Sequence, residues 1–285
     1  MASGLNGVQN RVKDTVPQAL FVHCYALTLN LVMSQGASKI KECKIFFANL
    51  GGLSAFFTRS PKRTKLLDEF CQRRLPRVTP VRWNFNTRLV CTVHEKRAEL
   101  VDLFQHILDQ AEDFDRETVH CASGHLAQLK SFDFCFFLFS FTGIFDIADV
   151  LFGILQSKTL DMQFCLARIA DCVEREREKF NEIFDKTAQA AGQPSALCRK
   201  TDVHAHYRQL HAAVVDNILA QIRNRFEDHK RLMFVGLLDS AQFQKFKLTF
   251  PEAELGSLME SYGTEFDLNR LKVELKVMYN MHSHA

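Results

Sequence analysis

Residues 4–32, GLNGVQNRVKDTVPQALFVHCYALTLNLV, carry a strand pattern followed directly by a helix pattern. Ala19 to Cys24 (ALFVHC) form a short apolar run that contains a β-branched residue and follows Pro17, which is typical of a β-strand. From Tyr25 onward the spacing changes, and the apolar residues fall on one helical stripe. The sequence therefore predicts one strand at about 19–24 and a helix after it.

Beyond this stretch the sequence predicts helices almost throughout. Ile45–Thr58 is expected to be a helix that is broken or kinked at Gly51-Gly52, followed by a basic loop at 59–63. A helix from about Thr64 to Arg74 follows the loop, and Pro76 and Pro80 mark a connector. The later helices are longer, and they are expected at about Asn86–Ala111, Asp115–Leu129, Phe132–Ser157, Asp161–Ala191 and Asp202–His229.

The segment Asp161–Ala191 has the clearest amphipathic pattern. Its charge run at 174–179 (EREREK) is expected to be a solvated helix face, because its opposite charges stand three residues apart. Its core stripe is expected to contain Phe164, Ile169, Val173, Phe180, Ile183 and Phe184.

Residues 4–32 resemble the hAT superfamily of DNA transposases, in the form found in zinc-finger MYM-type and THAP-domain relatives. There the stretch reads YDGAANMSGKYNGVQARI, followed by VHCYAHRLNLVL. This chain keeps His23, Cys24 and Asn30 of that motif, but Leu27 stands where the relatives have histidine. Two further stretches resemble the family: Val81-Arg82-Trp83-Asn84 is similar to its TRW motif, and residues 266–275 are similar to the end of its helical insertion domain.

The resemblance implies a mainly α protein in two parts. Residues 1–85 would be a partial ribonuclease-H-like α/β domain that contains the strand at 19–24. Residues 86–285 would be the all-α insertion domain of the family. The catalytic aspartate of YDG would lie before Met1, so the chain is expected to be a fragment or to come from a truncated gene model.

The same resemblance implies that the chain is not an enzyme. Strand transfer by this family needs carboxylates that converge on two Mg²⁺ ions, and the first two would lie upstream of this chain. The leucine at position 27 can neither donate a hydrogen bond nor bind a metal. No catalytic residue, metal or cofactor is therefore expected, and a fragment of an active transposase is the remote alternative.

A basic stretch with one tryptophan is the expected nucleic-acid-binding site. In active relatives the TRW tryptophan lies near bound DNA, a role that base stacking on Trp83 would suit, and Arg82 could contact a phosphate. The alternatives for the basic stretch are a plain solvated surface and a nuclear-import patch. Its cations are Arg59, Lys62, Arg63, Lys65, Arg73, Arg74, Arg77 and Arg82.

Histidines are frequent, but their spacing is not that of a zinc site, in which two close pairs are separated by a loop. On a helix, His204 and His211 would share a face and His206 would point away from it. The other close groups are His120-Cys121-xxx-His125 and His282-x-His284.

Composition and hydropathy argue against a secreted protein and against a membrane-spanning one. The nine cysteines form no CxxC pair, and the N-terminus lacks a secretory signal, so reduced thiols in a nuclear or cytoplasmic protein are expected. The most apolar window, Phe134–Phe145, is too short to span a bilayer. By resemblance, we expect a domesticated nuclear protein that binds protein partners or itself and has no small-molecule substrate. A nucleic-acid-binding module is the alternative.

Overall fold

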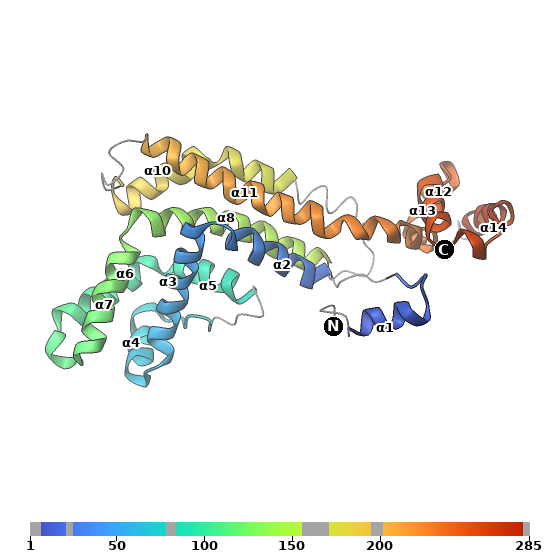
Figure 1. Ribbon diagram of the computed structural model, residues 1–285. Coiled ribbons are helices and arrows are strands. Elements are labelled where there is room, and N and C mark those ends of the chain that lie inside the picture. The colour runs from blue at the N-terminus through green and yellow to red at the C-terminus, as the bar shows by residue number, and fades with distance from the viewer. Residues whose placement is uncertain (1–6, 21–24, 78–83, 156–170, 195–201, 282–285) are drawn as a thin grey trace. The chain divides into compact units, whose positions relative to one another are not determined.

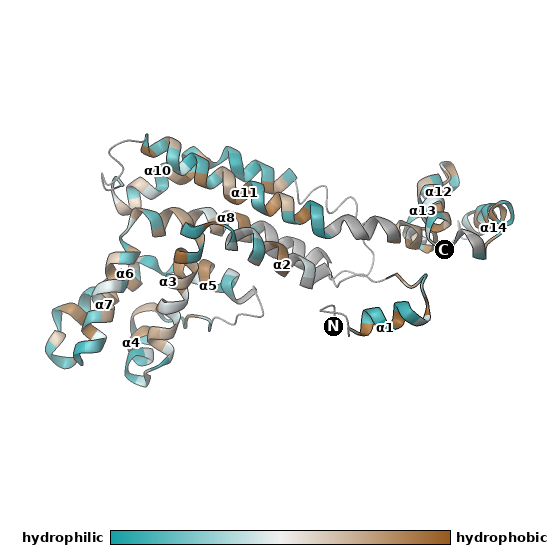
Figure 2. Ribbon diagram, in the orientation of Figure 1, coloured by the Kyte–Doolittle hydropathy of each residue, from teal (hydrophilic) through white to brown (hydrophobic). Residues whose placement is uncertain are grey.

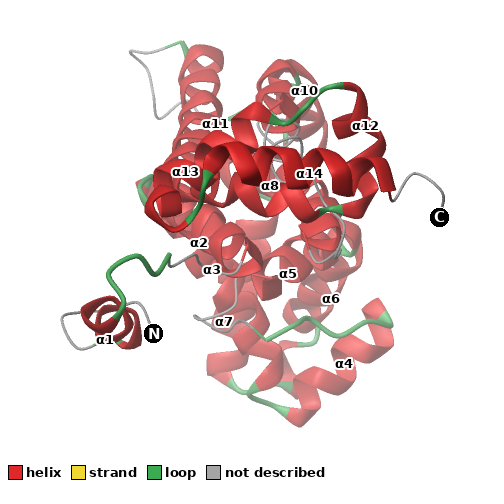
Figure 3. Ribbon diagram, turned by 90° about the vertical axis from the view of Figure 1, so that its right-hand side faces the viewer, coloured by secondary structure: helices red, strands yellow, loops and turns green. Residues whose placement is uncertain are grey.

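The computed structural model describes residues 7–20, 25–77, 84–155, 171–194 and 202–281 (Figure 1). Within these ranges all regular structure is helical (Figure 3), which confirms the prediction of a mainly α protein. Of the strand expected at 19–24, only Ala19 and Leu20 are described, and they belong to neither a helix nor a strand. The rest of the expected strand, residues 21–24, lies outside the described residues. No helix of the described chain is both long and apolar enough to cross a membrane.

The helices are numbered in the order in which they occur along the chain. The first seven α-helices are α1 (Val8–Thr15), α2 (Tyr25–Ser38), α3 (Lys41–Thr58), α4 (Pro61–Cys71), α5 (Asn84–Glu95), α6 (Arg97–Asp109) and α7 (Arg116–Leu129). They are followed by α8 (Phe132–Leu155), a helical stretch at 171–178, α10 (Phe180–Ala191), α11 (Val203–Phe226), α12 (Phe243–Leu248), α13 (Glu252–Tyr262) and α14 (Leu268–Met281). Short 3₁₀ helices are η1 (Ala111–Asp113), η2 (Glu227–Leu238), η3 (Ser240–Gln242) and η4 (Gly263–Glu265).

The chain forms two compact units. The first unit comprises Met1–Thr28, Ile154–Leu166 and Arg223–Ala285, and the second comprises Leu29–Gly153 and Ala167–Ile222. Each unit is defined by the contacts among its own residues. The domain boundary near residue 85 that the resemblance implies stays a prediction.

Phenylalanine rings build the core of the second unit. The ring of Phe46 on α3 lies 5.7 Å from that of Phe141 on α8, in a stacked arrangement, and 5.2 Å from that of Phe134. Farther along α3, Phe57 lies 5.5 Å from Phe104 of α6. Such offset and tilted ring pairs add to the stabilisation that burial alone provides, so these phenylalanines stabilise the core of the second unit.

The sequence predicts that helix α3 is broken or kinked at Gly51-Gly52, and the prediction of a break is wrong, because the helix continues through both residues. Leu50 and Leu53 on either side of them are buried, and this packing holds the helix together across the glycines. A side chain at Gly52 would meet only an edge of His125, at 3.7 Å. The glycines therefore mark no turn in this helix.

The expected basic loop at 59–63 is largely the first turn of α4. Ser60 caps this helix by accepting a hydrogen bond from the backbone N–H of Arg63, and Pro61 fills the first helical position. Gln72 then ends the helix in the left-handed conformation, at a φ of 52°.

The helix predicted at Asn86–Ala111 is two helices that meet at Lys96, so this prediction is also wrong in part. The junction positions Arg97, the first residue of α6, to contact two other helices. Its Nε donates to the backbone oxygen of Leu129 and its Nη2 to that of Ala190, both at 2.9 Å. One guanidinium thus binds the carboxyl-terminal carbonyls of α7 and α10, which their own helices leave unpaired.

The predicted helix at Asp161–Ala191 is interrupted at Lys179, between residues 171–178 and α10. Of its expected core residues, Val173, Phe180 and Ile183 are buried and Phe184 is half-buried. Phe164 and Ile169 lie outside the described residues.

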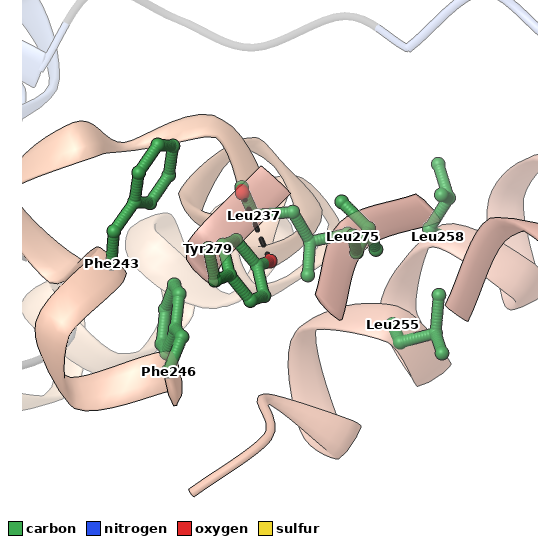
Figure 4. Packing of buried hydrophobic residues seen from close by; sticks show 7 residues of the cluster. All are labelled: Leu237, Phe243, Phe246, Leu255, Leu258, Leu275 and Tyr279. Carbon is green, nitrogen blue, oxygen red and sulfur yellow. Dashed lines mark hydrogen bonds between the residues drawn. The ribbon is translucent and has the colours of Figure 1, made fainter. Parts of the chain in front are cut away.

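The first unit has its own small core beneath α14. Tyr279 lies at its centre, between Phe243 and Phe246 of α12 on one side and Leu237 and Leu275 on the other (Figure 4). The Tyr279 hydroxyl donates to the backbone oxygen of Leu237 at 3.0 Å. Leu255 and Leu258 of α13 complete the cluster.

Candidate functional site

The structure describes only part of the expected family motifs. Leu27 and Asn30 lie in α2, the helix predicted after the strand. His23, Cys24, Arg82 and Trp83 lie outside the described residues. The expected nucleic-acid-binding site is therefore described only in its basic part, from Arg59 to Arg77.

Most cations of this basic part are already bound to groups of the protein. Arg74 forms a two-pronged ion pair with Asp68, with Nε–Oδ1 and Nη2–Oδ2 distances of 3.1 and 2.9 Å. This hydrogen bonding holds the pKa of Asp68 below its usual range. Arg73 pairs with Glu95, and the Lys65 Nζ lies 3.7 Å from Glu69. Phosphate contacts would have to replace these pairs.

Two further cations are bound by aromatic rings and a backbone oxygen. Lys62 donates from Nζ to the backbone oxygen of Asp113 at 2.6 Å and lies over the ring of Phe114. The Arg63 guanidinium lies over the ring of Phe56, 4.4 Å from its centre. Arg59 and Arg77 are exposed, and no ion pair involves them within the described residues.

The candidate histidines among the described residues do not converge on one site. His204 packs edge-on against Phe180 and Phe184, and His211 lies against Phe180 as well, so the two share a face as predicted. His125 lies between Phe56 and Phe104 on a different set of helices. Across the part of the chain that the structure describes, no group of three or more His, Cys, Asp or Glu side chains could hold a metal ion.

None of the six cysteines in the described residues forms a disulfide. Burial is the main reason that the pKa of Cys43 rises to about 12 and that of Cys71 to about 11. These two thiols therefore stay protonated at neutral pH, as inert core residues do.

A buried polar cluster, which the sequence pattern did not predict, lies where three helical segments of the second unit meet. We define it as Ser140 of α8, Glu176 of the 171–178 segment and His211 of α11. Each of these residues is only 1% exposed. The prediction of a solvated charge run at 174–179 is therefore wrong at Glu176. The missed signal is spacing, because Glu176 stands three residues after Val173 and four before Phe180, on the buried stripe.

Contacts around Glu176 explain how a carboxylate fits in this core. Its Oε1 pairs with Lys179 Nζ at 2.5 Å, and the Lys179 side chain is half exposed. Its Oε2 lies 2.5 Å from the place where a side chain at Gly143 would begin. His211 Nε2 donates to the backbone oxygen of Glu176 at 2.8 Å. Gly143 thus leaves the space that the carboxylate occupies.

Ser, His and Glu are also the residue types of a hydrolytic triad, but their arrangement is different in this cluster. In a triad the carboxylate accepts from one imidazole nitrogen and the other nitrogen faces the serine. In this chain Nε2 is bound to a backbone carbonyl, and the 1% exposure of all three residues leaves a substrate no access. Burial lowers the pKa of His211 below its usual range, so the ring is neutral at pH 7. The cluster is part of the core and is not catalytic.

An exposed apolar stripe on α14 is the other unusual feature. Val273, Val277 and Met281 stand four residues apart on one face, and they are 61%, 51% and 73% exposed. The opposite face of the same helix buries Leu275 and Tyr279 in the core of the first unit. α14 is therefore apolar on two sides, and only one of them is covered by the described residues. The alternation of apolar and polar residues along the short α1 is visible in Figure 2. Val8 and Val12 of this helix are also exposed, at 63% and 47%.

No protein-family model matches this chain, and no solved structure matches it. The residues themselves are therefore the basis for any statement about function.

Proposed function

We propose that this chain is a domesticated, catalytically inactive hAT-transposase-like protein that acts by binding, as a helical module for protein association in the nucleus. The family part of the proposal rests on the resemblance at residues 4–32 and on Leu27, which replaces the histidine of the relatives. The binding part rests on the surface. The partner that the surface supports best is a second copy of the chain.

The observation that carries the proposal is the uncovered stripe of α14. A helix with a single apolar side needs one packing partner, whereas α14 has two apolar sides. Val273, Val277 and Met281 form a continuous ridge, and such exposed apolar surface is a common mark of an interaction site.

The charges beside the stripe are compatible with a second copy of the chain. Arg270 and Glu274 lie on the same edge of the stripe and pair within the helix, with an Nε–Oε1 distance of 2.8 Å. In an antiparallel pair related by a two-fold axis, the same edge of both helices meets. With the two-fold axis at Val277, Val273 of one copy would face Met281 of the other, and Arg270 would keep its ion pair with Glu274 inside its own helix, so no charge is left unpaired.

The size of the stripe determines how strongly two copies are expected to associate. Three exposed side chains cover much less than the roughly 800 Å² that each partner buries in a standard interface. The proposal is therefore a weak, reversible dimer and not an obligate one.

Nucleic-acid binding has less support from the structure. Lys65, Arg73 and Arg74 are paired with carboxylates, and Lys62 is bound to a backbone oxygen. Phosphates would have to compete with these partners, so the gain from counterion release would be reduced.

Sedimentation velocity of the full chain over a concentration series tests the proposal. The wild-type chain should show a rising average mass, and Val273→Asp/Val277→Asp should stay monomeric while keeping its helical circular dichroism. The matched control is Val8→Asp/Val12→Asp, which adds the same charge to exposed valines of α1 and should behave as the wild type does. A wild-type chain that stays monomeric up to its solubility limit would refute self-association.

A second arm separates the alternative function. Labelled duplex DNA is titrated with the chain across a salt series, beside Arg59→Ala/Arg77→Ala. Tight, salt-dependent binding that this variant loses would favour the nucleic-acid module, whereas the proposal expects weak binding that the variant changes little.

A further inference from the structure

The polar cluster of Ser140, Glu176 and His211 contains three buried atoms without a hydrogen-bond partner in the described protein. They are Ser140 Oγ, Glu176 Oε2 and His211 Nδ1. Each comes from a different helical segment of the second unit, and each residue is 1% exposed. A buried polar atom with no partner costs about 1–3 kcal/mol, so three such atoms require an explanation.

Ser140 belongs to the stripe of α8 that Glu176 and His211 contact. Ser140 stands three residues before Gly143 on α8, and Oε2 of Glu176 rests against Gly143. Phe136 stands one turn before Ser140 on the same face, and its ring centre lies 6.3 Å from that of His211. The stripe Phe136, Ser140 and Gly143 therefore forms one wall, and Glu176 and His211 lie against it.

The hydrogen-bonding character of each atom is fixed by chemistry. The backbone oxygen of Glu176 can only accept, so His211 Nε2 carries the hydrogen of the neutral ring. Nδ1 is consequently a bare acceptor. Oε2 of an ionised carboxylate is a second acceptor, and the Ser140 hydroxyl can supply one donor. The serine alone can therefore satisfy only one of the two acceptors.

We propose that this cluster is a binding site for a single ordered water molecule. One water donates to Glu176 Oε2 and to His211 Nδ1 and accepts from the Ser140 hydroxyl, which satisfies all three atoms. Buried waters in proteins make about three hydrogen bonds of this kind to otherwise unpaired groups. The water then joins α8, the 171–178 segment and α11 at one point. Gly143 keeps the site open, because a larger residue would displace the carboxylate that forms one side of it.

A high-resolution crystal structure of the full chain tests this site directly. The expected result is a spherical density peak about 2.7–3.2 Å from Oε2, Nδ1 and Oγ. Absence of a peak, or a direct hydrogen bond from Ser140 that leaves no room for one, would overturn the proposal.

Oxygen-17 relaxation dispersion of water provides an independent count in solution. The wild-type chain should hold one more long-lived water than Ser140→Ala/Glu176→Leu/His211→Leu, if that variant keeps its helical circular dichroism. Thr142→Val, which changes a neighbouring hydroxyl of α8 that bonds to its own helix, is the matched control and should lose none. Equal counts in the wild type and the folded triple variant would refute the site. If the triple variant does not fold, Ser140→Ala takes its place in a crystal structure, which should show the same water with one hydrogen bond fewer.

Discussion

At the scale of single residues, Gly143 determines how closely the 171–178 segment can approach α8. A Cβ at this position would lie 2.5 Å from Glu176 Oε2. Gly143→Ala should lower the free energy of unfolding by roughly 1–2 kcal/mol, because the clash outweighs the gain in helix propensity. Denaturant unfolding followed by circular dichroism measures the change.

The control for Gly143→Ala is Gly124→Ala in α7. Nothing lies within 4 Å of a Cβ at Gly124, which is exposed. This variant should gain about 0.5–1 kcal/mol from helix propensity alone. Equal stabilisation by both alanines would show that Glu176 does not rest against α8.

His211 should make the stability of the second unit depend on pH. Burial is the main cause that lowers its pKa, although the nearby Glu176 acts in the opposite direction. The unfolded chain therefore binds the proton first, and stability is full above about pH 6.5 and is lost as the pH falls below it. The slope for one histidine is at most about 1.4 kcal/mol per pH unit.

Unfolding free energies measured between pH 7.5 and pH 5 check this prediction. His211→Gln should show a shallower loss on acidification than the wild type. Some loss should remain, because burial also lowers the pKa of His94 and His125. Parallel pH profiles of the wild type and the variant would contradict the role of His211.

At the scale of helices, Asp115 is the residue that starts α7. Its Oδ1 accepts from the backbone N–H of Thr118 at 2.8 Å, and its Oδ2 accepts from the Thr118 hydroxyl at 2.6 Å. Asp115→Ala should lower the free energy of unfolding by about 1 kcal/mol, whereas Asp115→Asn should keep most of the stabilisation that the cap provides. Thermal unfolding of the three proteins provides the comparison, and an equal loss in both variants would point to charge and not to the cap.

The hydrogen bonds from Thr118 also hold the pKa of Asp115 below its usual range. The stabilisation by the ionised Asp115 cap is therefore present above about pH 4 and disappears as the pH falls through the pKa of Asp115 in the folded chain.

Helices with a local start signal could be predicted from the sequence, and their junctions could not. The expected helix Asp115–Leu129 agrees with α7 because the capping aspartate is visible in the sequence. Gly51-Gly52 suggested a break, but buried neighbours override the low helix propensity of glycine. The junction at Lys96 has no glycine or proline to mark it, and it depends on contacts of Arg97 with residues far along the chain.

The candidate site was the least predictable part. A run of alternating charges is usually solvated, and Glu176 is buried only because Gly143 and His211 meet it from two other segments. The charges of the basic stretch could be counted from the sequence, but their partners could not. Glu95 and Asp113, which bind Arg73 and Lys62, lie far from them in sequence.

At the scale of the whole molecule, the two units have separate cores and should lose structure separately. Among the described residues of the first unit, Tyr279 is the largest fully buried side chain. Tyr279→Ala should destabilise that unit by about 3–5 kcal/mol through the cavity and the lost hydrogen bond to Leu237.

Hydrogen exchange read by mass spectrometry can resolve the two units. The variant should lose protection in α12, α13 and α14, whereas α6 and α7 of the second unit should keep theirs. Loss of protection in all of these helices to the same extent would mean that the units unfold as one.

The double contact of Arg97 has a consequence for mutational tolerance. Its planar fork reaches the ends of α7 and α10 in two directions at once, and the single ammonium of a lysine is not preorganised to do so. In a deep mutational scan scored by protein abundance, position 97 should therefore reject lysine nearly as strongly as it rejects an uncharged residue. Neighbouring exposed positions should accept the same exchange of one cation for another.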